Sequence, residues 1–201
     1  MLGMLARRIE QHFIDSADLK YQAAALLSPA ISAAVEAILA CVTSGGKVLA
    51  CGDGESRASA QQFVNSFIGR FERDRPELAA LVLSASPGVA HGQDGALASG
   101  FYARQVRALG QAGDVLLAVS TTGKEQSVLA AVEAAHEREM VVVVLSAGND
   151  DMMALVMRDT DILINIPHVR VARILEVQVL VVHCLCDGVD VLLLGDSEVN
   201  P

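Results

Sequence analysis

Two stretches of the chain share one design, and that design constrains the fold more than any other feature. In residues 113–132, GDVLLAVSTTGKEQSVLAAV, the apolar run Val115–Val119 ends in a Ser-Thr-Thr-Gly turn, and an amphipathic helix follows. Residues 47–61, KVLACGDGESRASAQ, repeat this order. A strand that leads through such a turn into a helix presents free backbone N–H groups and the positive helix end to an anion. The pair predicts a parallel sheet with a ligand crevice at the carboxyl ends of its strands.

The rest of the chain alternates strand and helix patterns without a linker or a low-complexity run. Apolar runs predict strands at 47–51, 78–83, 115–119, 140–145 and 161–166. Helical spacing predicts helices at 5–27, 30–42, 57–71, 101–109, 124–138, 152–157 and 169–194. Residues 84–100 read as a long loop, of a length that is often functional. This alternation predicts a doubly wound α/β domain.

The first two predicted helices are separated at Ser28 and Pro29, because proline suits the first position of a helix. Two helices before the first strand are more than a small sheet needs. They would either cover the sheet or pack against another subunit, and we favour subunit packing.

The composition limits where the protein is expected to reside and what it is expected to bind. Hydrophobic residues make up 52% of the chain and charged residues 19%, an apolar surplus that favours oligomers. A net charge of −9 argues against binding to nucleic acid phosphates. The 4 cysteines lack the spacing of a disulfide framework, and no uncharged run reaches the roughly 18 residues of a membrane span. We expect a soluble, cytoplasmic protein that binds neither nucleic acid nor a membrane.

The last predicted helix carries a polar row on an otherwise apolar sequence. Its members, which we call the polar row, are Glu176, His183, Asp187 and Asp190. Their spacing places them on one face of the helix, either as a satisfied interface network or as the wall of an active site. The structural reading is the commoner of the two. Cys184 and Cys186 lie two residues apart, face different sides and are expected to be core residues.

The two glycine turns contain acids as well as hydroxyl groups. Glycines let the backbone approach a ligand, and Ser56 and Ser120 supply hydroxyls. Asp53, Glu55 and Glu125, however, place carboxylates in or beside the same turns. A carboxylate near a helix N-terminus is stabilised by the helix dipole and competes with an incoming phosphate. We therefore do not expect tight phosphate binding.

Several motifs carry a resemblance to a known family. The most specific are CGDGESRASAQQF, RFERDRP, YARQVRALGQAGDVLLAVSTTG, AAHEREM and IPHVRVARILEVQVLVVHCLCDGVD. They resemble the sugar isomerase (SIS) domain of the phosphoheptose isomerase group over nearly the whole chain. They are especially similar to that group's non-catalytic relative, which associates with the replication initiator DnaA. The resemblance implies a flavodoxin-like, doubly wound five-stranded parallel sheet in a homotetramer with shared active sites. It also implies a single domain over 1–201, with oligomerisation helices in 1–45 and an α/β core in 46–195.

The positions that bind metal, usually zinc, in the isomerases of this group are changed here. The group's His and Glu on the helix after the first glycine turn correspond to Gln62 and Ser66. Its Gln on the last helix corresponds to Leu175, so that only His183 survives. One imidazole cannot hold zinc, which needs three or four ligands, and Ser66 has no pKa suited to the proton transfer that the group's Glu performs. The resemblance therefore implies no catalytic residue, no metal and no cofactor, with His183 as a relic.

These observations lead to an expected site and function. Degenerate sugar-phosphate turns are predicted at Gly52, Asp53, Gly54, Ser56, Ser120, Thr121, Thr122 and Gly123. Leucines end the last helix, either to close the core or to dock a partner, and Leu193 and Leu194 are the predicted docking residues. The leading expectation is a non-catalytic homotetrameric adaptor that binds DnaA and promotes its assembly at the replication origin. The alternatives are a phosphoheptose isomerase with zinc, converting sedoheptulose 7-phosphate to a heptose 7-phosphate, and a weak sugar-phosphate sensor.

Overall fold

A computed structural model describes residues 2–84, 100–148 and 152–196 of the chain. Its strands are β1 (Val48–Gly52), β2 (Ala80–Val82), β3 (Val115–Val119), β4 (Val141–Ala147) and β5 (Ile162–Ile166). Its helices are α1 (Leu2–Thr43), α2 (Ser56–Ile68), α4 (Phe101–Leu109), α5 (Gln126–Glu137), α6 (Met152–Val156) and α7 (Val171–Leu194). The strands form one parallel sheet in the order β2-β1-β3-β4-β5. This is the flavodoxin-like order, so the predicted doubly wound sheet is confirmed.

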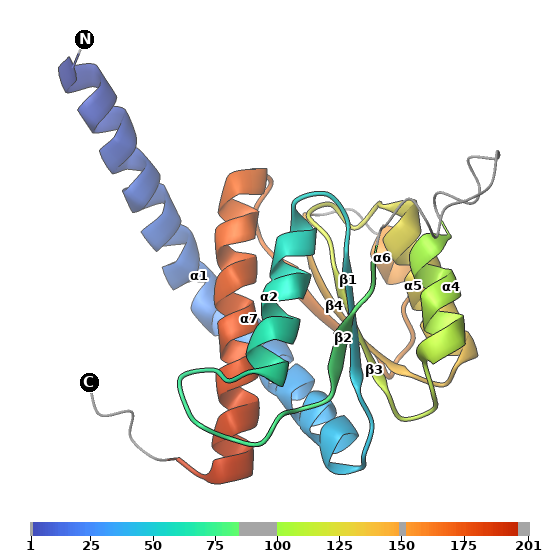
Figure 1. Cartoon of the computed structure of the whole chain (residues 1–201). Coiled ribbons are helices and arrows are strands. Elements are labelled where there is room, and N and C mark those ends of the chain that lie inside the picture. Colours follow the sequence, from blue (N-terminus) through green and yellow to red (C-terminus); the bar gives the residue numbers. More distant parts are fainter. Residues whose placement is uncertain (1, 85–99, 149–151, 197–201) are drawn as a thin grey trace.

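Helices cover both faces of the sheet, with α1, α2 and α7 on one face and α4, α5 and α6 on the other (Figure 1). Successive strand residues point to opposite faces, so Val48 and Ala50 join the core under α2 and α7, and Leu49 and Cys51 join the core under α4 and α5. Because both faces are buried, the strands read as continuous apolar runs rather than alternating ones.

The register of β1 and β3 places the two glycine turns side by side. Val48 pairs with Val115 at one end, and Gly52 pairs with Val119 at the other. Both strands therefore leave the sheet at the same level, and the turns that follow them meet at its carboxyl edge. This is the predicted position of the ligand crevice.

One continuous helix, α1, runs through Ser28 and Pro29, so the predicted break between two helices is wrong. A buried stripe continues through this region at helical spacing, made up of Leu19, Ala23, Leu27, Ala34, Val35 and Ile38. Pro29 is itself exposed and costs the helix one hydrogen bond. The Ser28 hydroxyl donates to the Ala24 carbonyl at 2.5 Å nearby. Burial of the stripe outweighs the bond lost at proline.

The amino-terminal part of α1 projects from the body of the molecule (Figure 1). Its exposed large apolar side chains include Met4, Leu5, Ile9, Phe13 and Ile14. By length and composition alone, α1 and α7 are both apolar enough to span a membrane. Because α7 packs against both α1 and α2, its composition is that of a core helix. The exposed face of α1 suits the predicted subunit packing, which stays a prediction.

The other predicted boundaries lie within a few residues of the structure, apart from β2, which is shorter than the run at 78–83. The predicted loop at 84–100 lies outside the described residues except at its two ends.

Candidate functional site

The turn after β1 brings the backbone close to the start of α2. A Cβ atom at Gly52 would lie 2.7 Å from the carbonyl oxygen of Ser56, so only glycine fits there. Gly54 has a φ of +54°, in the left-handed region that glycine adopts freely. The Tyr102 hydroxyl donates to the Gly52 carbonyl at 2.6 Å and fixes the end of the strand. The turn is thus closely packed, and α2 begins directly beside it.

The turn after β3 is closed by hydrogen bonds to its own hydroxyls. Ser120 Oγ accepts the backbone N–H groups of Thr122 at 3.1 Å and Gly123 at 2.6 Å. Thr122 Oγ1 accepts the backbone N–H of Lys124 at 3.2 Å. Both hydroxyls then donate to the carboxylate of Glu125: Ser120 in a short bond to Oε2, and Thr122 at 3.0 Å to Oε1. The side chain of Glu125 therefore lies in the position where this turn would hold an anion.

A second carboxylate joins the two turns. Asp53 accepts the N–H of Gly54 at 2.8 Å and, through its other oxygen, the hydroxyl of Ser127 at 2.8 Å. Ser127 lies in the first turn of α5, so this bond holds the turn after β1 against the helix after β3. The structure thus brings together the predicted turn residues around 52–56 and 120–123.

The helix α7 reaches this crevice through Gln178, which sequence reasoning missed. Its amide nitrogen donates to the Ser120 carbonyl at 2.6 Å, and its side chain is fully buried. The signal that could have found it is a single glutamine within an apolar run of the last helix. Its Oε1 and the buried Ser56 Oγ have no hydrogen-bond partner among the described residues. A buried polar atom without a partner is costly, and it marks where a ligand could bond.

His183 lies beside α2 rather than in the turns. Its Nε2 is 2.7 Å from the Gln62 amide nitrogen, and its ring is 5.3 Å from that of Phe71. An amide nitrogen can only donate, so in this contact His183 Nε2 is the acceptor. Gln62 follows Ser56 by six residues, which places the pair about 9 Å along α2 from the turn. His183 is therefore set apart from the two turns along α2.

The side chains around His183 do not suit zinc. Glutamine, serine and leucine occupy the three other positions implied by the resemblance, Gln62, Ser66 and Leu175. Within the described ranges, no group of three or more His, Cys, Asp and Glu side chains could hold a metal ion. The donor set thus offers one imidazole, and zinc requires three or four ligands.

Three members of the polar row of α7 contact separate partners along the helix. Glu176 pairs with Arg173, His183 contacts Gln62, and Asp190 forms a buried ion pair with Arg75 at 2.5 Å. The structural reading holds for Asp190, since both of its pair's side chains are only 1% exposed. Burial raises the pKa of Cys186 to about 12, as expected of a core thiol.

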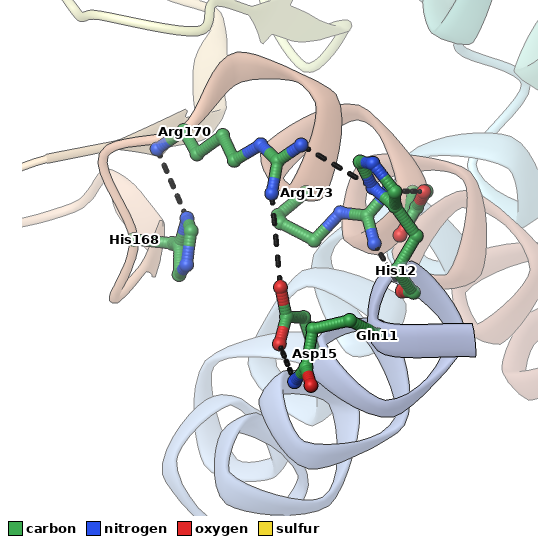
Figure 2. Close-up of polar contacts among 7 residues, drawn as sticks. Gln11, His12, Asp15, His168, Arg170 and Arg173 are labelled. Atoms are coloured by element: carbon green, nitrogen blue, oxygen red, sulfur yellow. Dashed lines mark hydrogen bonds and ion pairs between the residues drawn. The ribbon is translucent and has the colours of Figure 1, made fainter. Parts of the chain in front are cut away.

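A cluster of polar side chains joins the start of α7 to α1 (Figure 2). Arg170 lies 3.2 Å from His12 Nδ1 and 3.7 Å from Asp15. Arg173 donates to the His12 carbonyl at 2.5 Å, and the N–H of Arg170 donates to His168 Nδ1 at 3.0 Å. The contacts of Arg170 and Arg173 with His12 join residues more than 150 positions apart, so no local pattern predicts them.

The predicted docking leucines are exposed at the end of α7. Leu193 is 37% and Leu194 46% exposed. Exposure is required of a docking patch and does not identify a partner, so this role stays a prediction.

Known proteins resemble the chain over nearly its whole length. The SIS domain family matches residues 11–147. The phosphoheptose isomerase of Methylibium petroleiphilum is 51% identical over 201 residues, covering 99% of this chain and 100% of that protein. That of Laribacter hongkongensis is 46% identical over 193 residues, covering 95% and 98%.

Solved structures agree with the sequence relatives. Phosphoheptose isomerase GmhA from Neisseria gonorrhoeae superposes with a TM-score of 0.84 at 40% identity, covering 92% of this chain and 98% of that one. A phosphoheptose isomerase from Francisella tularensis gives a TM-score of 0.86 at 36% identity, covering 92% and 97%.

These relatives overturn the leading expectation. The predicted function as a non-catalytic DnaA adaptor is wrong, because close relatives over the full length are named as isomerases. The comparisons also lend no support to a special closeness to the DnaA-associating relative. That prediction gave three altered positions more weight than the remainder of the sequence. The chain belongs to the SIS domain family and, within it, to the phosphoheptose isomerase group.

Proposed function

We propose that this protein is a sugar-phosphate isomerase that interconverts sedoheptulose 7-phosphate and a heptose 7-phosphate. The observation that carries the proposal is the 51% identity, from end to end, with a phosphoheptose isomerase. The crevice at the carboxyl edge of the sheet is the place where this fold binds its ligands.

His183 is the proposed proton carrier. Isomerisation between an aldose and a ketose needs a base that takes a proton from the carbon next to the carbonyl, giving an enediol, and returns it to the neighbouring carbon. An imidazole can do this. In the resting protein Gln62 contacts His183 Nε2 at 2.7 Å, so this nitrogen takes the substrate proton only once the bound sugar has displaced the Gln62 amide. Since the donor set around His183 does not suit zinc, the proposed reaction uses the side chains alone.

The proposal includes a cytoplasmic homotetramer. Its support is the exposed apolar face of the projecting part of α1, together with the apolar residues at the end of α7. Light scattering coupled to gel filtration would measure the mass. A monomer at micromolar concentration would contradict this part of the proposal.

Turnover by the purified, EDTA-dialysed protein tests the reaction itself. We expect conversion of sedoheptulose 7-phosphate by the wild type, and loss of about a hundredfold or more in kcat for His183→Ala, the usual contribution of a positioned base. His168→Ala is the matched control, because His168 is half-buried like His183 and contacts the backbone of Arg170. Failure of the wild type to convert the sugar phosphate would refute the proposal.

Sugar-phosphate binding without turnover is a second candidate. The observation that favours it is the set Gln62, Ser66 and Leu175 in place of metal-binding side chains. Thermal unfolding with sedoheptulose 7-phosphate separates the two functions. Binding without reaction would stabilise the protein by about 2.7 kcal/mol at a hundredfold excess over Kd, with no product formed.

A further inference from the structure

We propose that Glu125 is a specificity-determining residue whose carboxylate holds the anion position of the turn after β3, so that a substrate phosphate binds there only by displacing it. This inference rests on the proposed function in one respect, that the crevice receives a sugar phosphate. It concerns how strongly the phosphate end is held.

The hydroxyls of Ser120 and Thr122 accept bonds from the backbone, and this leaves their hydrogens to donate to Glu125. Ser120 Oγ accepts two backbone N–H groups, so its own hydrogen is left to donate. Thr122 Oγ1 accepts one N–H and likewise donates outward. Each carboxylate oxygen of Glu125 receives one of these hydrogens. Two oxygens of a phosphate would need the same two donors.

The electrostatic setting favours an anion at this place. Glu125 precedes α5, a helix of 12 residues, so its charge lies at the positive helix end. Because the carboxylate is part of the chain, it occupies the site without the entropy cost that a free ligand pays. A phosphate brought to the same donors would face a like charge at contact distance.

Two buried polar side chains beside the turns have atoms that are free to bond a ligand. Gln178 and Ser56 are fully buried, and Gln178 Oε1 and Ser56 Oγ have no hydrogen-bond partner among the described residues. The nitrogen of the same Gln178 amide donates to the Ser120 carbonyl, so Oε1 lies beside the turn. Sugar hydroxyls would supply the missing donors and acceptors. Gln178 Oε1 and Ser56 Oγ are therefore available to bond the sugar, whereas the Glu125 carboxylate occupies the position of its phosphate.

Isothermal titration calorimetry on the full chain tests this assignment with inorganic phosphate, sedoheptulose 7-phosphate and unphosphorylated sedoheptulose. The variants are Glu125→Ser, which frees the two hydroxyls, and Glu125→Gln, which removes the charge and keeps an acceptor. Glu133→Gln is the matched control, an exposed acid on the same helix. Because the Glu125 side chain makes no capping bond to α5, both variants should fold.

We expect Glu125→Ser to bind phosphate and the sugar phosphate at least about tenfold tighter than the wild type, since a like charge at contact opposes binding strongly. Glu125→Gln should gain less, and Glu133→Gln nothing. Affinity for unphosphorylated sedoheptulose should stay unchanged. An equal gain for that sugar, or no gain for phosphate in either Glu125 variant, would overturn the assignment. The titrations need no turnover, so loss of the proposed isomerase activity would leave this result standing.

Discussion

The buried ion pair between Arg75 and Asp190 holds the end of α2 to α7, and removing its cation should destabilise the protein strongly. Arg75 Nε donates to Asp190 Oδ1 at 2.5 Å, and each side chain is only 1% exposed. The guanidinium also donates to the carbonyls of Ser66 and Phe67, both at 2.9 Å. Arg75→Met would therefore leave a buried carboxylate and two carbonyls of α2 without their donor.

Loss of one partner from a buried pair costs about 3–5 kcal/mol. Burial already raises the pKa of Asp190 above its usual range, against the lowering effect of Arg75. Without Arg75 the carboxylate takes up a proton more readily, which relieves part of the cost. We therefore expect Arg75→Met to lower the free energy of unfolding by about 3 kcal/mol, near the lower end of that range.

Urea unfolding at one fixed protein concentration measures this loss. Arg70→Met is the matched control, because the Arg70–Asp74 pair is also 2.5 Å long but its side chains are 67% and 88% exposed. Arg70→Met should lower the free energy of unfolding by less than about 1 kcal/mol. The double variant Arg75→Met with Asp190→Leu should recover part of the loss, since no buried charge remains. A cost for Arg75→Met no larger than that of Arg70→Met would refute the reasoning.

Two further predictions concern α1 and the thiols. Pro29→Ala should raise the free energy of unfolding by about 1–3 kcal/mol in urea, because Pro29 is exposed within a continuous helix and blocks one hydrogen bond; unchanged or lower stability would contradict this. Burial raises the pKa of Cys51 and Cys186 to about 12, so neither thiol should react with iodoacetamide at pH 8 in the native protein, and both should react in urea. Mass spectrometry of labelled peptides reads the outcome, and native labelling of either residue would count against the buried thiols.

Local sequence signals predicted the position of every strand, and they were most accurate where strong turn residues bound the element. The run Val115–Val119 and the helix Phe101–Leu109 agree with the structure at both ends, since glycines or a Ser-Thr-Thr-Gly turn interrupt the chain beside them. The predicted helix break at Pro29 was wrong for the opposite reason. Its local signal is strong, but the buried stripe of α1 against α7 decides the conformation.

The site was only partly predictable, because its contacts join distant parts of the chain. The sequence placed Glu125 near the phosphate turn and predicted competition, and the structure adds its two hydroxyl donors. The contacts of Gln178 with Ser120 and of Asp190 with Arg75 span 58 and 115 positions, and no local pattern predicts such pairs. The polar row on α7 was found by its spacing, but Glu176, His183 and Asp190 contact separate partners.

Hydrogen exchange at the sugar carbons tests the central claim most directly. The EDTA-dialysed wild type is incubated with sedoheptulose 7-phosphate in D2O, and proton NMR follows deuterium at the carbons next to the carbonyl. Proton transfer through His183 predicts deuterium in both the ketose and the aldose product with the wild type and with His168→Ala, and neither exchange nor product with His183→Ala. No exchange in the wild type, exchange that appears only after zinc is added, or exchange that persists in His183→Ala would contradict the account.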